Sequence, residues 1–396
     1  MRRLLSLLLV LSFSAFAAEP LPLAKPETVG MSAERLGRIG DWVDGMIQRK
    51  QAAGFVTLVA RRGKVVHYET SGTLGLSVNQ PMPEDALFDI ASMTKPVTVV
   101  AALMLLEEGR FTMDDPISRY LPEFKNMRVQ VPQLGTAPAE SEITVRHAFT
   151  HTTGVGANWP VTKRYEFATF REYMQEMAKV PLVYQPGSTW LYGDSLDVLG
   201  YLVETVSGQP LGDFVQQRIL DPLGMGDTHY WIPKSKESRR AVLNVRGQDD
   251  LEGTSRRPLE AVKRASLVMG ASGLYSTAAD YWRFSQMLVN GGELNGKRLL
   301  GPRTVGWIAE DHLGDAKKFD RAGQTFGLGH AVTVDPGAQS WYYSRGSYFW
   351  SGSQGTVFWV DPKEELVGVL MVQVSGVPGL SLREKFAGLV YGAIVD

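Results

Sequence analysis

Apolar residues near the start of the chain follow two different periods. The first period is helical, since they recur every three or four positions at Leu36, Ile39, Trp42, Val43, Met46 and Ile47. Two apolar runs come next, at residues 55–60 and 65–70, with the polar turn 61–64 between them. Short apolar runs joined by a turn that contains glycine predict a β-hairpin, here one that follows a helix.

The other end of the chain shows the same elements in the opposite order. Residues 356–360 and 366–374 are rich in β-branched and aromatic residues, and the polar residues 361–364 join them. These two runs predict a second pair of strands. Residues 382–394 have a helical pattern and predict a helix that follows the strands.

Between the two ends the apolar pattern is mostly helical. It occurs in five segments, at residues 98–108, 170–177, 196–207, 211–219 and 278–289. Two polar stretches, 130–141 and 246–258, predict surface loops.

The whole pattern predicts an α+β fold, in which an antiparallel sheet built from both chain ends is flanked by helices and carries an inserted, mainly helical lobe. We place the lobe that holds the sheet at residues 25–75 and 265–396, and the mainly helical lobe at residues 76–264.

The composition narrows the classes of function. The chain has 396 residues, of which 44% are hydrophobic and 21% charged, as in soluble globular proteins. Its formal net charge is -1, so no basic surplus is available to neutralise phosphates, and we expect no nucleic-acid partner. The absence of cysteine excludes disulfides, thiol catalysis and cysteine-based zinc sites.

The first residues predict a secretory signal peptide at residues 1–17. Arg2 and Arg3 precede an apolar run at 4–16, and Ala15-Phe16-Ala17 is a small-x-small cleavage signal. The run is short for a membrane-spanning helix, which argues against an uncleaved anchor. We therefore expect an exported protein, periplasmic or secreted, with no stable membrane anchor after cleavage. The sequence leaves the oligomeric state open.

The sequence Ser92-Met93-Thr94-Lys95 is the only S-x-x-K motif in the chain. An extended segment precedes it, and Pro96 suits the first turn of a helix that continues through residues 97–106. Ser92 is then expected at a helix N-terminus, with Lys95 one turn later on the same face.

This placement fits a nucleophile, because a serine hydroxyl needs a base and a partly desolvated lysine amine can serve as one. It also fits a plain serine cap followed by a solvated lysine. On the order of one S-x-x-K match is expected by chance in a chain this long, so the motif alone does not separate the two.

Seven further or overlapping segments carry a resemblance to a known family. In order they are LFDIASMTKP (87–96), DDP (114–116), YLPEF (120–124), TVRH (144–147), THTTG (150–154), DPLGM (221–225) and GLYSTAAD (273–280). With them the chain resembles the serine β-lactamase and penicillin-binding-protein superfamily, in particular the class C β-lactamase-like, or family VIII, esterases. The resemblance spans about residues 26–390. It implies the β-lactamase/transpeptidase-like fold and an acyl-enzyme formed on Ser92.

The resemblance also assigns a second catalytic segment, Tyr192-Gly193-Asp194, which is similar to the family's Y-x-N pattern. It implies that Tyr192 acts as the base together with Lys95. Asp194 departs from the pattern, because an asparagine amide can donate to a β-lactam side chain whereas a carboxylate only accepts. This departure argues against β-lactam recognition.

A third segment, Trp350-Ser351-Gly352-Ser353, stands where β-lactamases have K-T-G. Trp350 replaces the lysine, so the cation that would meet a β-lactam carboxylate is missing. The resemblance implies that Trp350, Ser351 and Gly352 bind substrate, together with Asp194. It also implies an oxyanion hole formed by the backbone N–H groups of Ser92 and Ser353.

The sequence has no convincing motif for a metal or a cofactor. His147 and His151 have the spacing of neighbours on a helix, but no glutamate lies between them as in the zinc motif HExxH. We expect no metal and no cofactor.

These observations predict a serine hydrolase, most simply a carboxylesterase on short-chain esters, with a small-molecule ester or amide as substrate. One alternative is a class C-type β-lactamase or D-amino-acid peptidase with the same catalytic residues. Another is a catalytically silent binding domain on this fold, against which the intact Ser92, Lys95 and Tyr192 argue.

Overall fold

The computed structural model describes residues 19–156, 166–246, 251–255, 268–314, 316, 319, 321–339, 341–376 and 380–396. The predicted signal peptide at 1–17 lies outside the described residues. Within the part of the chain that is described, no helix is both long and apolar enough to cross a membrane.

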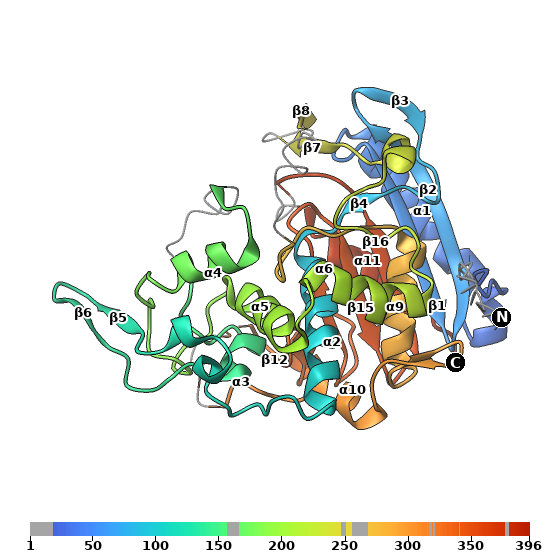
Figure 1. Ribbon diagram of the computed structural model, residues 1–396. Helices are drawn as coiled ribbons and strands as arrows, with labels where there is room; N and C mark the ends of the chain where they lie inside the picture. The colour runs from blue at the N-terminus through green and yellow to red at the C-terminus, as the bar shows by residue number, and fades with distance from the viewer. Residues whose placement is uncertain are drawn as a thin grey trace, which may run out of the picture.

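An antiparallel sheet of eight strands forms the centre of the molecule, in the order β12-β13-β14-β15-β16-β1-β2-β3 (Figure 1). Its N-terminal strands are β1 (Gly54–Arg61), β2 (Lys64–Gly75) and β3 (Val78–Pro81), and its C-terminal strands are β12 (Gln324–Phe326), β13 (Ala331–Thr333), β14 (Tyr348–Ser351), β15 (Val357–Asp361) and β16 (Leu366–Met371). The two groups meet where β1 pairs with β16, with Val56 opposite Met371. The fold predicted from the apolar pattern, one sheet built from both chain ends, is therefore confirmed.

Helices cover both faces of this sheet. Neighbouring residues of a strand point to opposite faces, and on β15 Phe358 packs against Tyr281 while Trp359 packs against Phe386. Tyr281 belongs to α9 (Ala278–Val289) and Phe386 to α11 (Leu382–Tyr391), which packs beside α1 (Ala33–Gln48). Because both faces are covered, all residues of β1 and β16 are buried, and these strands appear in the sequence as continuous apolar runs.

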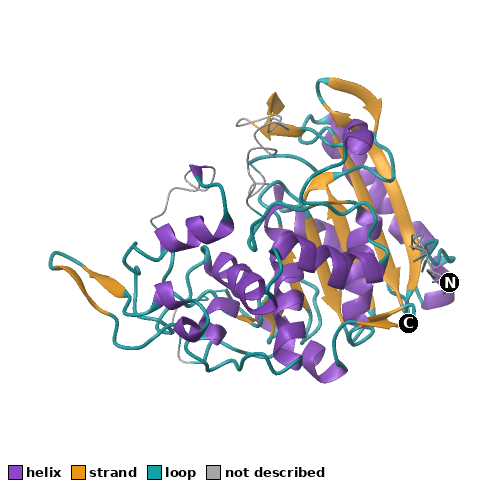
Figure 2. Cartoon of the chain, in the orientation of Figure 1, coloured by secondary structure: helices purple, strands orange, loops and turns teal. Residues whose placement is uncertain are grey.

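A mainly helical region lies beside the sheet (Figure 2). It contains α3 (Val145–Phe149), α4 (Phe170–Met177), α5 (Ser195–Ser207), α6 (Leu211–Val215) and α7 (Asp221–Leu223), while α10 (Pro302–Ile308) lies nearer the C-terminal strands. Between sheet and helices runs α2 (Thr94–Glu107), which packs against α5 and α6 and is buried from Thr94 to Leu105. The segment predicted as one helix at 211–219 divides at Val215, where a wider π-type turn, Gln216–Leu220, follows α6.

Several short strands differ from the pattern-based expectation. The polar stretch at 130–141 forms most of a hairpin of β5 (Arg128–Val131) and β6 (Gly135–Pro138) that extends from the helical region (Figure 1). The stretch at 246–258 contains the last residue of β7 (Leu243–Arg246) and the whole of β8 (Leu251–Ser255), which pair as a second hairpin. These hairpins are formed by hydrogen bonds between backbone groups, and their side chains are mostly polar. Their sequences therefore lack the apolar alternation that identifies a half-buried strand. The remaining two-stranded pairs are β4 (Phe88–Asp89) with β9 (Tyr275–Ser276), and β10 (Glu293–Leu294) with β11 (Lys297–Arg298).

Candidate active site

Ser92 lies in a tight turn between a strand and a helix. Strand β4 ends at Asp89, a 3-10 turn spans Ala91–Met93, and α2 begins at Thr94. The backbone of Ala91 is left-handed, with φ 43°, and the Asp89 carboxylate accepts its N–H at 2.9 Å. Few residues other than glycine adopt this conformation, so the hydrogen bond helps to hold a turn that the chain alone disfavours. Ser92 therefore occupies the start of the helix, where the sequence pattern placed it.

Lys95 and Tyr192 both reach the hydroxyl of Ser92. Lys95 Nζ lies 3.2 Å from Ser92 Oγ, and Tyr192 Oη donates to the same oxygen at 2.7 Å. Lys95 Nζ is 4.6 Å from the centre of the Tyr192 ring, so the three groups form one cluster. Lys95 is buried, whereas 40% of Tyr192 is exposed. The serine oxygen thus contacts an amine and a phenol, and either group can take the serine proton once it has lost its own, which is the geometry that nucleophilic catalysis requires.

A buried carboxylate that the sequence analysis did not single out fixes the surroundings of Lys95. Lys95 Nζ also donates to the carbonyl of Ala271 at 2.9 Å, and the N–H of Ala271 donates to Asp197 Oδ1 at 2.7 Å. Asp197 lies on α5 and is only 1% exposed. One signal was available in the sequence, since Asp197 is the single charged residue among the buried positions at the start of an otherwise apolar helix.

The end of β14 packs directly against the turn that carries Ser92. A Cβ atom on Gly352 would lie 2.6 Å from the carbonyl oxygen of Ile90, so only glycine allows the two backbones to approach this closely. Gln354 Nε2 donates to the second carboxylate oxygen of Asp89 at 3.2 Å. The exposed Ser353 is thereby held in a loop tied to the Ser92 turn, as an oxyanion hole shared between the two segments would require.

Trp350 contributes an apolar wall to this region. Its ring lies on β14, is 7% exposed and packs 5.5 Å from the ring of Tyr192 and 5.5 Å from that of Phe326. Trp190 and Phe319 extend the same aromatic cluster, with ring centres 4.9 Å apart. Next to Trp350, Ser351 is partly exposed. The position that the resemblance assigns to a lysine in β-lactamases is therefore occupied by an apolar ring.

Asp194 lies two residues beyond Tyr192, at the start of α5, and is half-buried. Its carboxylate faces Gly156, where an added Cβ atom would come within 2.2 Å of Asp194 Oδ2. Gly156 has a φ of 86°, which favours glycine on conformational grounds as well.

His147 and His151 do not share a helix face, despite their spacing. Helix α3 ends at Phe149, and His151 follows it with a left-handed backbone of φ 55°. His147 instead completes the capping box of α3, because its Nδ1 accepts the N–H of Thr144 at 3.1 Å. Among the residues described, no group of three or more histidine, aspartate or glutamate side chains is arranged to hold a metal ion.

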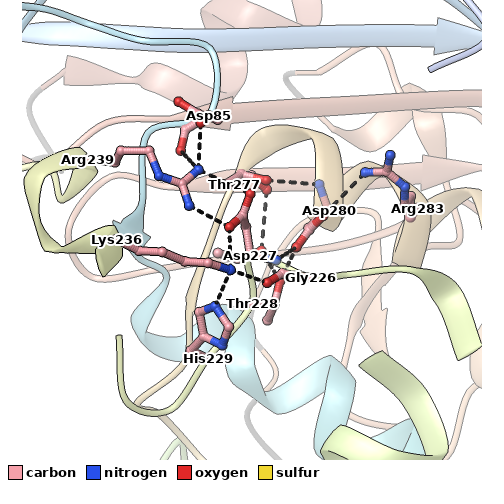
Figure 3. A network of polar contacts seen from close by, with 11 residues as sticks. Asp85, Gly226, Asp227, Thr228, His229, Lys236, Arg239, Thr277, Asp280 and Arg283 are labelled. Atoms are coloured by element: carbon pink, nitrogen blue, oxygen red, sulfur yellow. Dashed lines mark hydrogen bonds and ion pairs between the residues drawn. The ribbon is translucent and has the colours of Figure 1, made fainter. Parts of the chain in front are cut away.

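Two of the segments that carry the family resemblance, 221–225 and 273–280, lead into one polar network (Figure 3). Asp280, in the first turn of α9, accepts the N–H of Asp227 at 2.8 Å and the hydroxyl of Thr228 at 3.0 Å. Asp227 pairs with Lys236 at 2.8 Å and with Arg239 at 2.6 Å. Burial raises the pKa of Asp280 to about 6. Burial alone would also raise the pKa of Asp227, but the hydrogen bonds from Arg239 and Lys236 lower it to about 2.

The network supports the site from a distance rather than joining it. His229 exchanges backbone hydrogen bonds of 2.9 and 2.8 Å with Tyr275, and Tyr275 pairs with Asp89 in the β4–β9 ladder. The segment held by Asp227 and Asp280 therefore fixes the strand pair from which the Ser92 turn emerges.

Comparisons with known proteins agree with this geometry. A family model described as Beta-lactamase matches residues 39–389. Protein Rv1367c of Mycobacterium tuberculosis is 33% identical over 381 residues, which cover 86% of this chain and 95% of that protein. Esterase EstB of Burkholderia gladioli is 30% identical over 340 residues, which cover 78% of this chain and 82% of the esterase.

The fold has relatives of known structure as well. The structure of EstCE1, a hydrolase with promiscuous acyltransferase activity, superposes with a TM-score of 0.79 at 24% identity and covers 91% of this chain and 99% of its own. At this identity the superposition establishes the shared fold. The matched family model, the similarity to EstB and the common fold lead to one conclusion: the chain belongs to the beta-lactamase family and is a serine hydrolase.

Proposed function

We propose that the protein is a carboxylesterase that cleaves short-chain esters through an acyl-enzyme on Ser92. The observation that carries the proposal is the convergence on Ser92 Oγ of Lys95 Nζ at 3.2 Å and Tyr192 Oη at 2.7 Å. A serine hydroxyl with two such neighbours can lose its proton as it attacks a carbonyl carbon.

In the proposed reaction the Lys95–Tyr192 pair has first lost one proton to solvent. Ser92 Oγ then bonds to the ester carbonyl carbon, and its proton passes to the vacant position on the pair. The carbonyl oxygen becomes an oxyanion, which the backbone N–H groups of Ser92 and Ser353 stabilise because they are in place before the charge develops. The bond to the alcohol oxygen then breaks, and that oxygen takes the proton. Water attacks the acyl-enzyme in the same way and releases the carboxylic acid and Ser92.

The walls of the site favour an ester over a β-lactam. Trp350 supplies an apolar ring where a cation would bind the β-lactam carboxylate, and the carboxylate of Asp194 offers acceptors only. The similarity to Esterase EstB over 78% of the chain supports the same choice. The substrate therefore needs only a carbonyl group and a modest apolar body.

A fluorophosphonate probe tests this proposal. The probe should modify Ser92 in the folded protein, and mass spectrometry of the digested chain should place the adduct on the peptide that contains residue 92. The protein should also hydrolyse p-nitrophenyl acetate or butyrate. A folded protein that carries no adduct on Ser92 and hydrolyses neither ester would be a silent member of the fold.

A further inference from the structure

His151 contacts three successive residues centred on Tyr192. Its carbonyl oxygen accepts the N–H of Leu191 at 3.0 Å, and its Nδ1 accepts the N–H of Gly193 at 3.4 Å. Its ring packs against the ring of Tyr192, with centres 4.8 Å apart. One residue thus holds the backbone on both sides of the tyrosine and supports the phenol ring between them.

His151 is itself held rigidly. Its side chain is completely buried, and Tyr184 Oη donates to its carbonyl oxygen at 3.2 Å. The rings of Trp190 and Phe326 enclose the imidazole, with centres 6.0 and 5.6 Å away. Its backbone has a φ of 55°, a left-handed conformation that is uncommon in residues other than glycine and that the surrounding contacts hold in place.

The chemistry of the buried ring explains why this residue is a histidine. Because Nδ1 accepts the Gly193 N–H, the proton of the neutral ring lies on Nε2, which has no hydrogen-bond partner among the described residues. A polar atom left without a partner inside an aromatic cluster is unfavourable, and an apolar ring would avoid that cost. The acceptor at Nδ1 is the one contribution that a phenylalanine in this place could not make.

The ring is also neutral in the folded protein. Burial, together with the nearby positive charge of Lys95, lowers the pKa of His151 well below its ordinary value. A neutral imidazole keeps Nδ1 free to accept and does not repel the ammonium of Lys95.

We propose that His151 is the positioning residue of Tyr192: it holds the phenol oxygen within reach of Ser92 Oγ and makes no contact with the substrate. The inference rests on the proposed function, since it assigns His151 a role only if Tyr192 serves Ser92. Tyr192 needs such support because it is 40% exposed and precedes α5 instead of lying within it. A displacement of about 1 Å at a catalytic group can cost on the order of 100-fold in rate.

Two substitutions of His151 separate the contribution of its ring from that of its hydrogen-bond acceptor, Nδ1. His151→Phe keeps a ring in the cluster but removes the acceptor for Gly193, and we expect kcat for p-nitrophenyl butyrate to fall on the order of 100-fold with little change in KM. His151→Asn removes the ring but keeps an acceptor oxygen near the Nδ1 position and tolerates the left-handed backbone, so it should retain clearly more kcat than His151→Phe. His147→Gln is the matched control. Glutamine also suits the capping box, and we expect this variant to keep wild-type kcat.

A double-mutant cycle with Tyr192→Phe gives the decisive readout. If His151 acts through Tyr192, His151→Phe should lower the residual rate by less than about threefold once the phenol oxygen is gone. An equal loss in both backgrounds would overturn the inference, as would an Asn variant no better than the Phe variant. Fluorophosphonate labelling of the wild type distinguishes failure of the proposed function from failure of the inference on His151. If Ser92 carries no adduct, both are rejected. If Ser92 carries an adduct but the effects of the two substitutions are additive, only the inference is rejected.

Discussion

Ser92 Oγ has neighbours of very different exposure. Lys95 is 4% exposed and held by the Ala271 carbonyl, whereas Tyr192 is 40% exposed and held by its backbone and by ring contacts. The lysine is enclosed by protein, whereas the tyrosine is open to solvent. In the proposed mechanism the two groups act as a pair in the proton transfer from Ser92.

A shared base predicts strong non-additivity. Lys95→Ala and Tyr192→Phe should each lower kcat on the order of 10³-fold, and the double variant should lose little more, because either change disables the same proton transfer. Turnover of p-nitrophenyl butyrate by the two single variants and the double variant measures this. Ser92→Ala supplies the baseline, and circular-dichroism melts show whether each protein is folded. Two losses that multiply would contradict a shared base.

Asp194 provides a test of substrate selectivity. Asp194→Asn restores an amide donor two residues beyond Tyr192, where a carboxylate only accepts, so it should raise kcat/KM for nitrocefin several-fold. Ester hydrolysis should change less, because a simple ester has no side-chain amide to bind. The gain should stay partial, since Trp350 still provides no positive charge.

The ratio of nitrocefin to p-nitrophenyl butyrate turnover is the quantity to compare in the two proteins. An unchanged ratio would mean that Asp194 does not face the substrate. A wild-type protein that already prefers nitrocefin would contradict the esterase proposal itself.

At the scale of single residues, the sequence predicted the side chains that contact Ser92. It did not predict the residues that contact the surroundings of Lys95 and Tyr192. Ser92, Lys95 and Tyr192 lie in recognisable motifs, and the structure brings them together. Asp197 and His151 accept hydrogen bonds from Ala271 and Gly193, residues that only folding brings near them. A motif records residues that are close along the chain, and it carries no information on which backbone group a distant side chain will meet.

At the scale of elements, the site depends on the close approach of α5 to the segment that anchors Lys95. A Cβ atom on Gly270 would lie 2.1 Å from the carbonyl oxygen of Leu196 and 3.0 Å from Cα of Gly200. Thr98, one turn beyond Lys95 on α2, donates to the Gly270 carbonyl at 2.6 Å. Residues 270–271 therefore link α2 to α5, and the glycine sets their separation.

Gly270→Ala should push this segment away from α5. The overpacking should cost about 1–3 kcal/mol of unfolding free energy, and kcat should fall more than KM changes, because the Ala271 carbonyl that holds Lys95 moves. Gly306→Ala on α10 is the matched control. An added Cβ there meets nothing within 4 Å, and alanine should stabilise the helix by about 0.5–1 kcal/mol without affecting turnover. A Gly270→Ala protein of unchanged stability would contradict the packing described.

Elements with a strong apolar period were predictable, and those held by backbone pairing were not. Helices α4 and α9 have the bounds that their pattern predicts, and both have an apolar face. Strands β12 and β13 have only three residues each, too few to establish a period, and the β5–β6 hairpin is polar. Its turn depends on left-handed residues, among them Gln133 at φ 65° and Gly135 at φ 89°.

At the scale of the whole molecule, the folded protein lowers the pKa of its histidine side chains and so favours their neutral form. Burial lowers the pKa of each of the six, for His67 and His330 to about 4. Four of the six have less than a tenth of their surface exposed to solvent: His67, His151, His312 and His330. In the unfolded chain a histidine has a pKa of about 6.5. Between pH 6.5 and 4 the unfolded state therefore binds more protons than the folded state.

This difference predicts a stability that is complete above about pH 6.5 and is lost as the pH falls toward 4. Each proton bound only by the unfolded chain lowers the unfolding free energy by about 1.4 kcal/mol per pH unit. Asp280 acts in the opposite direction, because its raised pKa makes the folded state take up a proton below about pH 6. The histidines with lowered pKa values outnumber this one carboxylate, so the unfolding free energy is expected to fall as the pH decreases from 6.5 toward 4.

Urea unfolding followed by tryptophan fluorescence at several pH values from 7.5 to 4.5 measures this slope, and a single substitution tests its origin. His67 is 6% exposed and lies 2.8 Å from the hydroxyl of Thr57 through Nε2, so His67→Gln keeps a polar partner for Thr57 but removes one titrating group. Its slope between pH 6.5 and 5 should be smaller by about 1 kcal/mol per pH unit. If His67→Gln keeps the wild-type slope, or if the wild type is equally stable at pH 7 and pH 5, buried neutral histidines do not set the acid limit of this protein.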